Sequence, residues 1–194
     1  MTTNPITETS FVDLAAAPEQ VPSDSELRSA QLDAAATAWS TRINANPASA
    51  QLTYHVRGQA TGSVATTVTA GAHTFVVDEP AALAGEDSAA SPVEYALGAL
   101  IACQVVVIRL YAHTSGLVVD DIDIAAEGDI DVRGLFGLDD SVRAGFSAIR
   151  LTVTISGPES AEKYQQLVET AESRCPVFDL FSEPTPIEWR LASD

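Results

Sequence analysis

A short stretch near the middle of the chain decides the fold: SPVEYALGALIAC, residues 91–103. It opens with a serine suited to capping a helix, a proline suited to the first helical position and a glutamate three residues after the cap, which together form a capping box. The apolar residues continue over 95–108 with no polar stripe. Because a helix that is apolar on every side is buried on every side, we expect a central core helix that runs to about Thr114 and stops at Gly116.

The chain has two cysteines, and their surroundings differ. Cys103 lies in the middle of the predicted core helix, where a cysteine is most often an inert packing residue. The helix dipole fades beyond the first turn, so a reactive thiolate there needs a cation from elsewhere in the fold. Cys175 precedes Pro176 at the exposed end of a second predicted helix. That place suits a resolving thiol, which needs access and proximity more than a low pKa.

Upstream of the core helix, the sequence predicts one helix and a β-meander. Ser23 to Glu26 open a helical stretch that reaches about Ile43. Alternating residues and Thr/Val-rich runs then predict three strands separated by turns. The strands are expected at 52–56, 64–68 and 73–77, and the turns at 58–62 and 70–72.

Downstream, the sequence predicts two more strands, a helix and a final strand. Apolar and polar residues alternate along 118–131 and along 151–156, and a glycine-punctuated loop, 133–138, lies between them. The helix that begins near Gly157 should end before Pro176, since the residue before a proline avoids helical geometry. Its inner face is expected to carry Tyr164, Leu167, Val168 and Ala171, and the final strand to cover about 187–191. This order of strands and helices is an α+β plan.

Three regions are expected along the chain: a flexible tail (1–23), an N-terminal helical extension (24–46) and an α+β domain (47–194). The first is rich in Thr, Ser, Pro and acids and shows little periodicity. The N-terminus also has no basic and apolar signal-peptide pattern, and no uninterrupted apolar run reaches the length of a membrane span. We therefore expect a cytoplasmic protein.

The charge balance excludes several classes of partner. There are 27 acidic residues against 10 basic ones, a net charge of −17. Such a surface repels phosphate backbones and anionic lipid, so we expect no nucleic-acid and no membrane partner. The two cysteines and three histidines do not have a zinc-ligand spacing. A metal site that uses both cysteines and a histidine remains a minor hypothesis.

Four segments together resemble the OsmC/Ohr family, the osmotically inducible protein C and organic hydroperoxide resistance proteins. Residues 91–103 closely resemble its central-helix motif, in which the reactive cysteine follows a proline and an acidic residue. Residues 128–134, 145–149 and 175–177 resemble its later landmarks, in the same order. The resemblance covers about residues 50–191. It implies an OsmC-like α+β fold, with antiparallel sheets packed around a long buried central helix, in an intertwined homodimer with active sites at the subunit interface.

The resemblance also implies thiol-dependent reduction of organic hydroperoxides. By position, Cys103 would attack the peroxide and become a sulfenic acid, Cys175 would condense with it to a disulfide, and an external dithiol reductant would reset the pair. No metal or organic cofactor is implied. Glu94, which the capping box already explains, matches the acid of the family motif. Arg57 is the candidate for the arginine that holds the thiolate, with Arg42 as the alternative.

Two questions stay open at the level of sequence. Phe136, Leu138 and Phe146 could line a pocket for an alkyl peroxide or could be ordinary core residues. The chain could also be a non-enzymatic member of the same fold, a module that binds an apolar small molecule or a protein partner. A Cys103 pKa at or above the free value of about 8.5 would favour that alternative.

Overall fold

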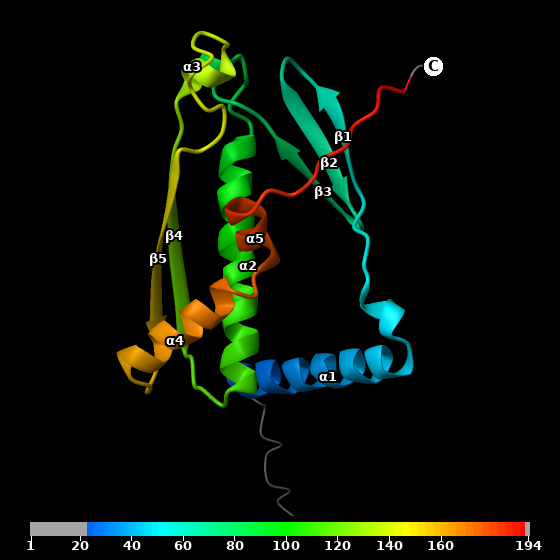
Figure 1. The fold of residues 1–194 in the computed structure, drawn as a ribbon, viewed down its shortest axis with the longest axis vertical. Coiled ribbons are helices and arrows are strands. Elements are labelled where there is room, and N and C mark those ends of the chain that lie inside the picture. Colours follow the sequence, from blue (N-terminus) through cyan, green and yellow to red (C-terminus); the bar gives the residue numbers. More distant parts are fainter. Residues whose placement is uncertain (1–22, 193–194) are drawn as a thin grey trace, which may run out of the picture.

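The computed structural model describes residues 23–192 and has an α+β architecture built around one long helix, α2 (Figure 1). The antiparallel pair β4–β5 lies along one side of α2, and the antiparallel sheet β1–β2–β3 lies on the other. The predicted fold class is confirmed. The elements are α1 (Asp24–Ala45), η1 (Pro47–Ala50), β1 (Val56–Thr61), β2 (Ala65–Ala70), β3 (His73–Val77), η2 (Ala81–Leu83), α2 (Pro92–Thr114), β4 (Asp121–Asp129), α3 (Val132–Leu135), β5 (Ala148–Ser156), α4 (Ala161–Glu172) and α5 (Pro176–Ser182).

The capping box at the start of α2 forms as predicted. Ser91 Oγ accepts a hydrogen bond from the Glu94 backbone N–H at 3.4 Å, and Glu94 Oε2 accepts one from the Ser91 N–H at 2.7 Å. After the last residue of α2, Gly116 has a φ of +67°, a conformation that favours glycine. The local sequence therefore determines both ends of the central helix.

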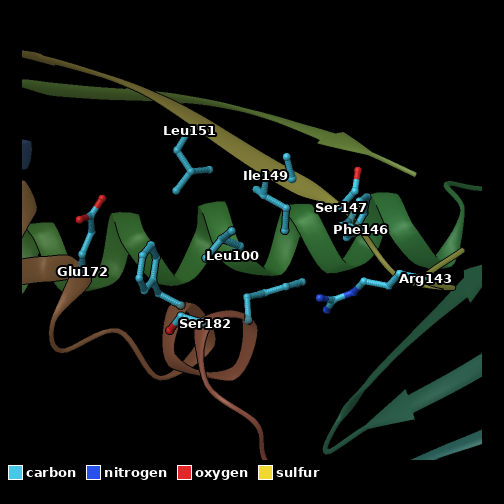
Figure 2. A pocket seen from close by; sticks show the side chains of 12 residues that line it. Leu100, Arg143, Phe146, Ser147, Ile149, Leu151, Glu172 and Ser182 are labelled. Atoms are coloured by element: carbon cyan, nitrogen blue, oxygen red, sulfur yellow. The ribbon is translucent and has the colours of Figure 1, made fainter. Parts of the chain in front are cut away.

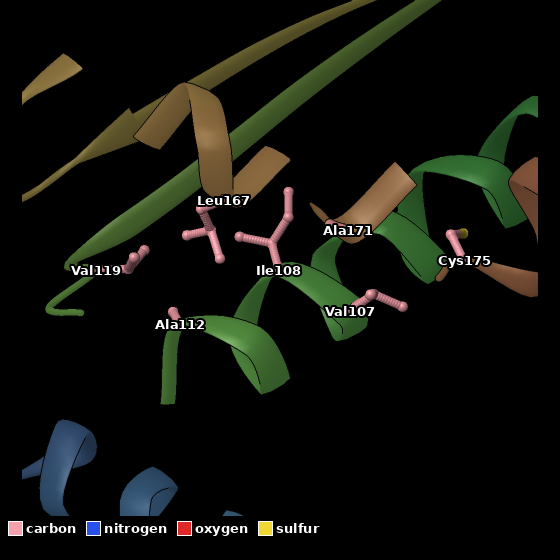
Figure 3. Close-up of a cluster of buried hydrophobic side chains, with 7 residues drawn as sticks. All are labelled: Val107, Ile108, Ala112, Val119, Leu167, Ala171 and Cys175. Carbon is pink, nitrogen blue, oxygen red and sulfur yellow. The ribbon is translucent and has the colours of Figure 1, made fainter. Parts of the chain in front are cut away.

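The buried core lies between α2 and α4. Ile108 and Ala171 are both 0 % exposed and face one another across these two helices (Figure 3). The predicted inner face of α4 is confirmed, with Leu167 and Ala171 buried and Tyr164 and Val168 partly buried against the core. The cluster consists of Val107, Ile108, Ala112, Val119, Leu167, Ala171 and Cys175.

The prediction that α2 is buried on every side is wrong for the single chain. Val106 is 65 % exposed and Leu110 is 37 % exposed, because β4, α4 and α5 cover only part of the helix surface. Among the described residues, α2 is the one helix long and apolar enough to cross a membrane by length and composition, a test that core helices also pass. Residues 23–192 thus leave one apolar face of α2 uncovered.

The first sheet differs from the prediction in its first turn. Residues 58–61, expected in a turn, belong to β1, and Gly58 pairs with Val68 of β2. The turn comes later, at Gly62, which has a φ of +59°. A Cβ on Gly58 would lie 3.1 Å from Thr66 Cγ2, so this glycine serves close packing between strands rather than chain reversal.

The C-terminal third requires three corrections. The loop predicted at 133–138 contains the short helix α3, and Pro176, expected only to end a helix, begins another, α5. Proline is favoured at a first helical position because its missing N–H has no partner to lose there. The strand predicted at 187–191 pairs with nothing among residues 23–192, and its apolar side chains are almost fully exposed: Ile187 86 %, Trp189 86 % and Leu191 87 %.

The helix α1 crosses the C-terminal end of α2 and buries none of its own residues (Figure 1). Asp33 of α1 contacts His113 of α2, with 2.8 Å between Oδ1 and Nε2. The predicted tail, residues 1–23, lies outside the described residues except for Ser23, and the division of the chain into three regions stays a prediction.

Replacing Ser91 by alanine removes the side-chain acceptor of the α2 capping box. We expect the free energy of unfolding, measured by urea denaturation, to fall by about 1 kcal/mol. The matched control is Ser23→Ala, which breaks the same motif at α1. Because α1 buries no residue, that variant should unfold like the wild type. Equal losses in the two variants would contradict the central role of α2.

Candidate active site

The two cysteines meet at the contact between α2 and the start of α5. Cys103 packs against the buried cluster that contains Cys175, and both the Cys175 side chain and the backbone N–H of Val177 are near enough to shift its pKa. Both cysteines are free thiols; Cys103 is half-buried, and Cys175 is 1 % exposed. Two thiols in contact can form a disulfide after one of them is oxidised.

The position of Cys175 differs from the prediction of an exposed helix end. The helix α4 ends at Glu172, and Cys175 is the buried N-cap residue of α5, with its sulfur accepting from the Phe178 N–H at 3.4 Å. Cys175 therefore caps the start of α5, where the sequence predicted only the end of the preceding helix.

The surroundings of Cys103 favour its neutral form. Burial raises the pKa of the Cys103 thiol, and so does the contact with Cys175, while the Val177 N–H acts in the opposite direction. Within the described part of the chain, no arginine or lysine is among the groups that shift this pKa. A peroxide-attacking thiolate at Cys103 thus needs a cation that residues 23–192 of the single chain do not bring to it.

The other two predicted site residues lie away from the thiols. Arg57 is exposed on β1, in the sheet on the opposite side of α2 from β4 and β5 (Figure 1). Glu94 lies nine residues before Cys103, about 13 Å along the helix axis. Its Oε2 accepts both the N–H and the hydroxyl of Ser91, and these bonds lower the Glu94 pKa. The catalytic roles of Arg57 and Glu94 stay predictions.

A pocket of about 560 Å³ lies between α2, β5 and α5 (Figure 2), and neither cysteine is among the residues that line it. Leu100, one helical turn before Cys103, forms its floor, and Phe178 and Phe181 of α5 form one wall. Figure 2 shows Arg143 and Glu172 at opposite ends of the pocket. The cavity combines apolar walls with one charged group at each end, and the helices that carry the cysteines form two of its sides.

Of the three apolar residues that could line a pocket or belong to the core, one lines the pocket. Phe146 lines this pocket, whereas Phe136 and Leu138 lie outside it and are 56 % and 75 % exposed. A Cβ on Gly128 would lie 2.5 Å from the Phe146 ring, so the glycine allows β4 to approach that ring. The sequence contains the glycine, but it does not indicate that Gly128 lies beside Phe146.

Sequence reasoning missed several residues around the thiols. Phe178 and Phe181 were missed because α5 was read as a loop after Pro176, and Arg143 lies in a segment without periodicity. Gln104 is 1 % exposed, and neither atom of its amide has a hydrogen-bond partner among residues 23–192. A buried unpaired amide costs free energy, and no sequence signal distinguishes it from its apolar neighbours.

The described residues offer little for a metal ion. Within 23–192, no three His, Cys, Asp or Glu side chains gather closely enough to hold one. The two cysteines contact each other, and His113 pairs with Asp33 at the far end of α2. The arrangement is suited to thiol chemistry.

Comparison with known proteins identifies the same fold. The structure is similar to an OsmC-like protein from Mycoplasma pneumoniae (TM-score 0.59, 17 % identity, covering 68 % of this chain and 88 % of that one). It is also similar to organic hydroperoxide resistance proteins from Legionella pneumophila and Elizabethkingia anophelis. Both have a TM-score of 0.53 and 20 % identity, and both alignments cover 68 % of this chain. They cover 90 % of the Legionella chain and 89 % of the Elizabethkingia chain. No curated protein is significantly similar to the chain.

The fold and the site define a class: α+β proteins in which a cysteine on the central helix lies near a second cysteine at the start of a later helix. The family model described as OsmC-like protein matches residues 85–190, more than half of the chain. The protein belongs to the OsmC/Ohr family. This match contains α2, both cysteines and the whole pocket.

Replacing Cys175 by serine should lower the pKa of Cys103. The variant removes the thiol that helps to raise this pKa and keeps a good N-cap residue for α5. Because the thiolate is the reactive form, alkylation of Cys103 by iodoacetamide should reach its half-maximal rate at a lower pH than in the wild type. Rates measured across pH, with adducts mapped by mass spectrometry, check this.

Cys103→Ser is the matched control for that experiment. Its remaining thiol, Cys175, is 1 % exposed and should react slowly at every pH. A Cys103 pKa that is unchanged or higher in Cys175→Ser would contradict the contact between the two thiols.

Proposed function

We propose that the protein reduces organic hydroperoxides with Cys103 and Cys175. The observation that carries the proposal is the proximity of the two thiols, with a pocket of about 560 Å³ that begins at Leu100, one helical turn from Cys103. Membership of the OsmC/Ohr family supports a role in redox stress. Two of the similar solved structures are named organic hydroperoxide resistance proteins.

The proposed reaction has three balanced steps. The Cys103 thiolate attacks the outer peroxide oxygen, the O–O bond breaks, and the alkoxide takes up a proton and leaves as an alcohol. Cys103 is then a sulfenic acid, and the Cys175 thiol attacks its sulfur to form a disulfide and release water. An external dithiol, a small molecule or a protein, reduces the disulfide by thiol exchange and is itself oxidised. No metal or organic cofactor takes part in any step.

In this proposal, the pocket holds the organic part of the hydroperoxide. Leu100, Phe178 and Phe181 offer apolar contact to a hydrocarbon group. Leu100 lies one helical turn from Cys103, so a substrate bound there has its peroxide end near the sulfur. The neutral thiol that the chain favours must still lose its proton before attack.

A second copy of the chain would complete the site, in an intertwined homodimer. Val106 is 65 % exposed on the α2 face that none of the described elements covers, and the side chains of 187–191 extend into solvent. Exposed apolar surface of this kind marks an interaction site. We propose that Arg57 of one copy reaches the thiolate in the other and stabilises its charge.

Glu94 has a place in the same proposal. Its Oε2 is occupied by Ser91, while Oε1 can accept from an arginine. Its lowered pKa keeps the carboxylate charged, so it can hold and orient Arg57. We also place the protein in the cytoplasm, where a reducing environment maintains free thiols between turnovers.

The alternative function is a non-enzymatic module that binds an apolar ligand in the same pocket. The raised pKa of Cys103 favours it, because a neutral thiol attacks peroxide poorly. The two functions differ in one observable: the binding module takes up an apolar compound without consuming peroxide.

The peroxidase assay distinguishes the two functions. With cumene hydroperoxide and dithiothreitol, the wild type should consume peroxide, and Cys103→Ser should fall to the uncatalysed rate because the attacking thiol is gone. Cys175→Ser should retain the first step and accumulate a sulfenic acid, detected by a dimedone adduct on Cys103. Peroxide consumption by Cys103→Ser at the wild-type rate would overturn the proposal, and so would an inactive wild type that binds cumene.

The same assay tests the arginine. Arg57→Gln should lower the rate roughly a hundredfold, the effect of losing one preorganised charge contact at a reacting centre. Arg42→Gln removes the same charge from the alternative candidate, on α1, and is the matched comparison. A greater loss in Arg42→Gln than in Arg57→Gln would reverse the assignment.

Val106→Glu should separate the proposed dimer into monomers. A glutamate there would be buried unpaired in the interface, which costs several times the thermal energy. Sedimentation velocity measures the result. The control is Thr152→Glu, on the exposed face of β5, which should remain dimeric. A wild type that sediments as a monomer at all concentrations would contradict the homodimer.

A further inference from the structure

A second pocket lies where α1 crosses the far end of α2. It has a volume of about 290 Å³ and is bounded by α1, by the last turns of α2 and by the segment that leads to β4. His113, one of its residues, is ten residues beyond Cys103, about 15 Å along the helix axis. This pocket is therefore separate from the thiol site, and an inference about it does not rest on the proposed peroxidase.

Two arginines converge on this pocket in a protein of net charge −17. Arg28 of α1 and Arg109 of α2 are both half-buried and line it. Burial lowers the pKa of Arg109, and the positive charge of Arg28 lowers it further. The two guanidinium groups are thus near enough to repel each other.

Within the part of the chain that the structure describes, neither arginine has a carboxylate partner in direct contact. Among residues 23–192, the ion pairs involve other side chains. Arg109 donates instead to two backbone carbonyls, Val119 O at 2.6 Å and Asp120 O at 3.3 Å. Asp120 and Asp121 offset part of its charge through space. Guanidinium N–H groups remain available to an anion in the pocket.

The rest of the pocket lining is partly polar and partly apolar. Ser29 contributes a hydroxyl 3.5 Å from His113 Nδ1, and the other ring nitrogen of His113 contacts Asp33 at 2.8 Å. Leu32 and Leu117 line the same space with apolar surface. A ligand that matches both the arginines and the apolar surface has a negatively charged group and a short hydrocarbon body.

We propose that this pocket binds a small organic carboxylate. The carboxylate lies between Arg28 and Arg109, where each planar guanidinium can donate two N–H groups to it, and the hydrocarbon body packs on Leu32 and Leu117. A polyphosphate fits less well, because its additional charge would face Asp120. The bound ligand contacts both α1 and α2 and thereby strengthens the docking of the N-terminal helix.

Calorimetric titration of the full chain with benzoate tests the proposal, with benzamide as the neutral analogue of the same shape. Benzoate should bind, and benzamide should bind at least about tenfold more weakly, since it lacks the charge for the arginines. Arg28→Gln should weaken benzoate binding by about the same factor. Arg28 lies on a helix without buried residues, so the variant keeps the fold. Arg109 is left unchanged because it holds the carbonyls of Val119 and Asp120.

Two controls locate the site. Arg42→Gln removes one positive charge from the same helix outside the pocket and should leave benzoate affinity unchanged. Cys103→Ser should also leave it unchanged, which separates this site from the thiol pocket. Absence of benzoate binding, equal affinity for benzamide, or wild-type affinity in Arg28→Gln would overturn the proposal. Tighter binding of inorganic phosphate than of benzoate would overturn the assigned ligand class.

Discussion

The close packing of α4 on α2 is the contact on which the rest of the structure depends. Ala171 and Ile108 are both 0 % exposed at this contact, and the small alanine side chain allows the two helices to approach. Because α4 ends at Glu172, the chain that leaves it must pass the middle of α2, and Cys175 arrives beside Cys103. The thiol pair is thus a consequence of helix packing. Local sequence contributes only the proline that begins α5 at that point.

The opposite face of α2 is apolar and partly exposed. Val106 is 65 % exposed there, and burying this side chain against another surface would be favourable. Burial and Cys175 raise the pKa of Cys103, and no cation among residues 23–192 lowers it. The proposed homodimer would account for both features, because a second copy would cover the face and bring an arginine to the thiol.

Two of the pockets formed by residues 23–192 lie at different positions along α2, and they differ in chemistry. The pocket next to Leu100 combines aromatic and aliphatic walls with Arg143 and Glu172, and it lies within the part of the chain that matches the family model. The second pocket concentrates positive charge and depends on α1, which precedes the matched residues 85–190. The N-terminal helix therefore adds a chemically distinct surface to the OsmC-like core, at the end of the helix that carries Cys103.

Local signals in the sequence by themselves determined α2, because a capping box and a C-terminal glycine act within a few residues. They also determined the alternating strands β4 and β5 and the family motif around Cys103. They misplaced the first turn, since the role of Gly58 depends on the close approach of Thr66 on the neighbouring strand, and they missed α5, since Pro176 can end one helix or begin another. Only the tertiary structure decided that Cys175 is buried, that Arg57 and Glu94 lie away from it, and that Arg28 meets Arg109. Each of these facts depends on contacts between residues far apart in the chain, and sequence periodicity carries no information about such distances.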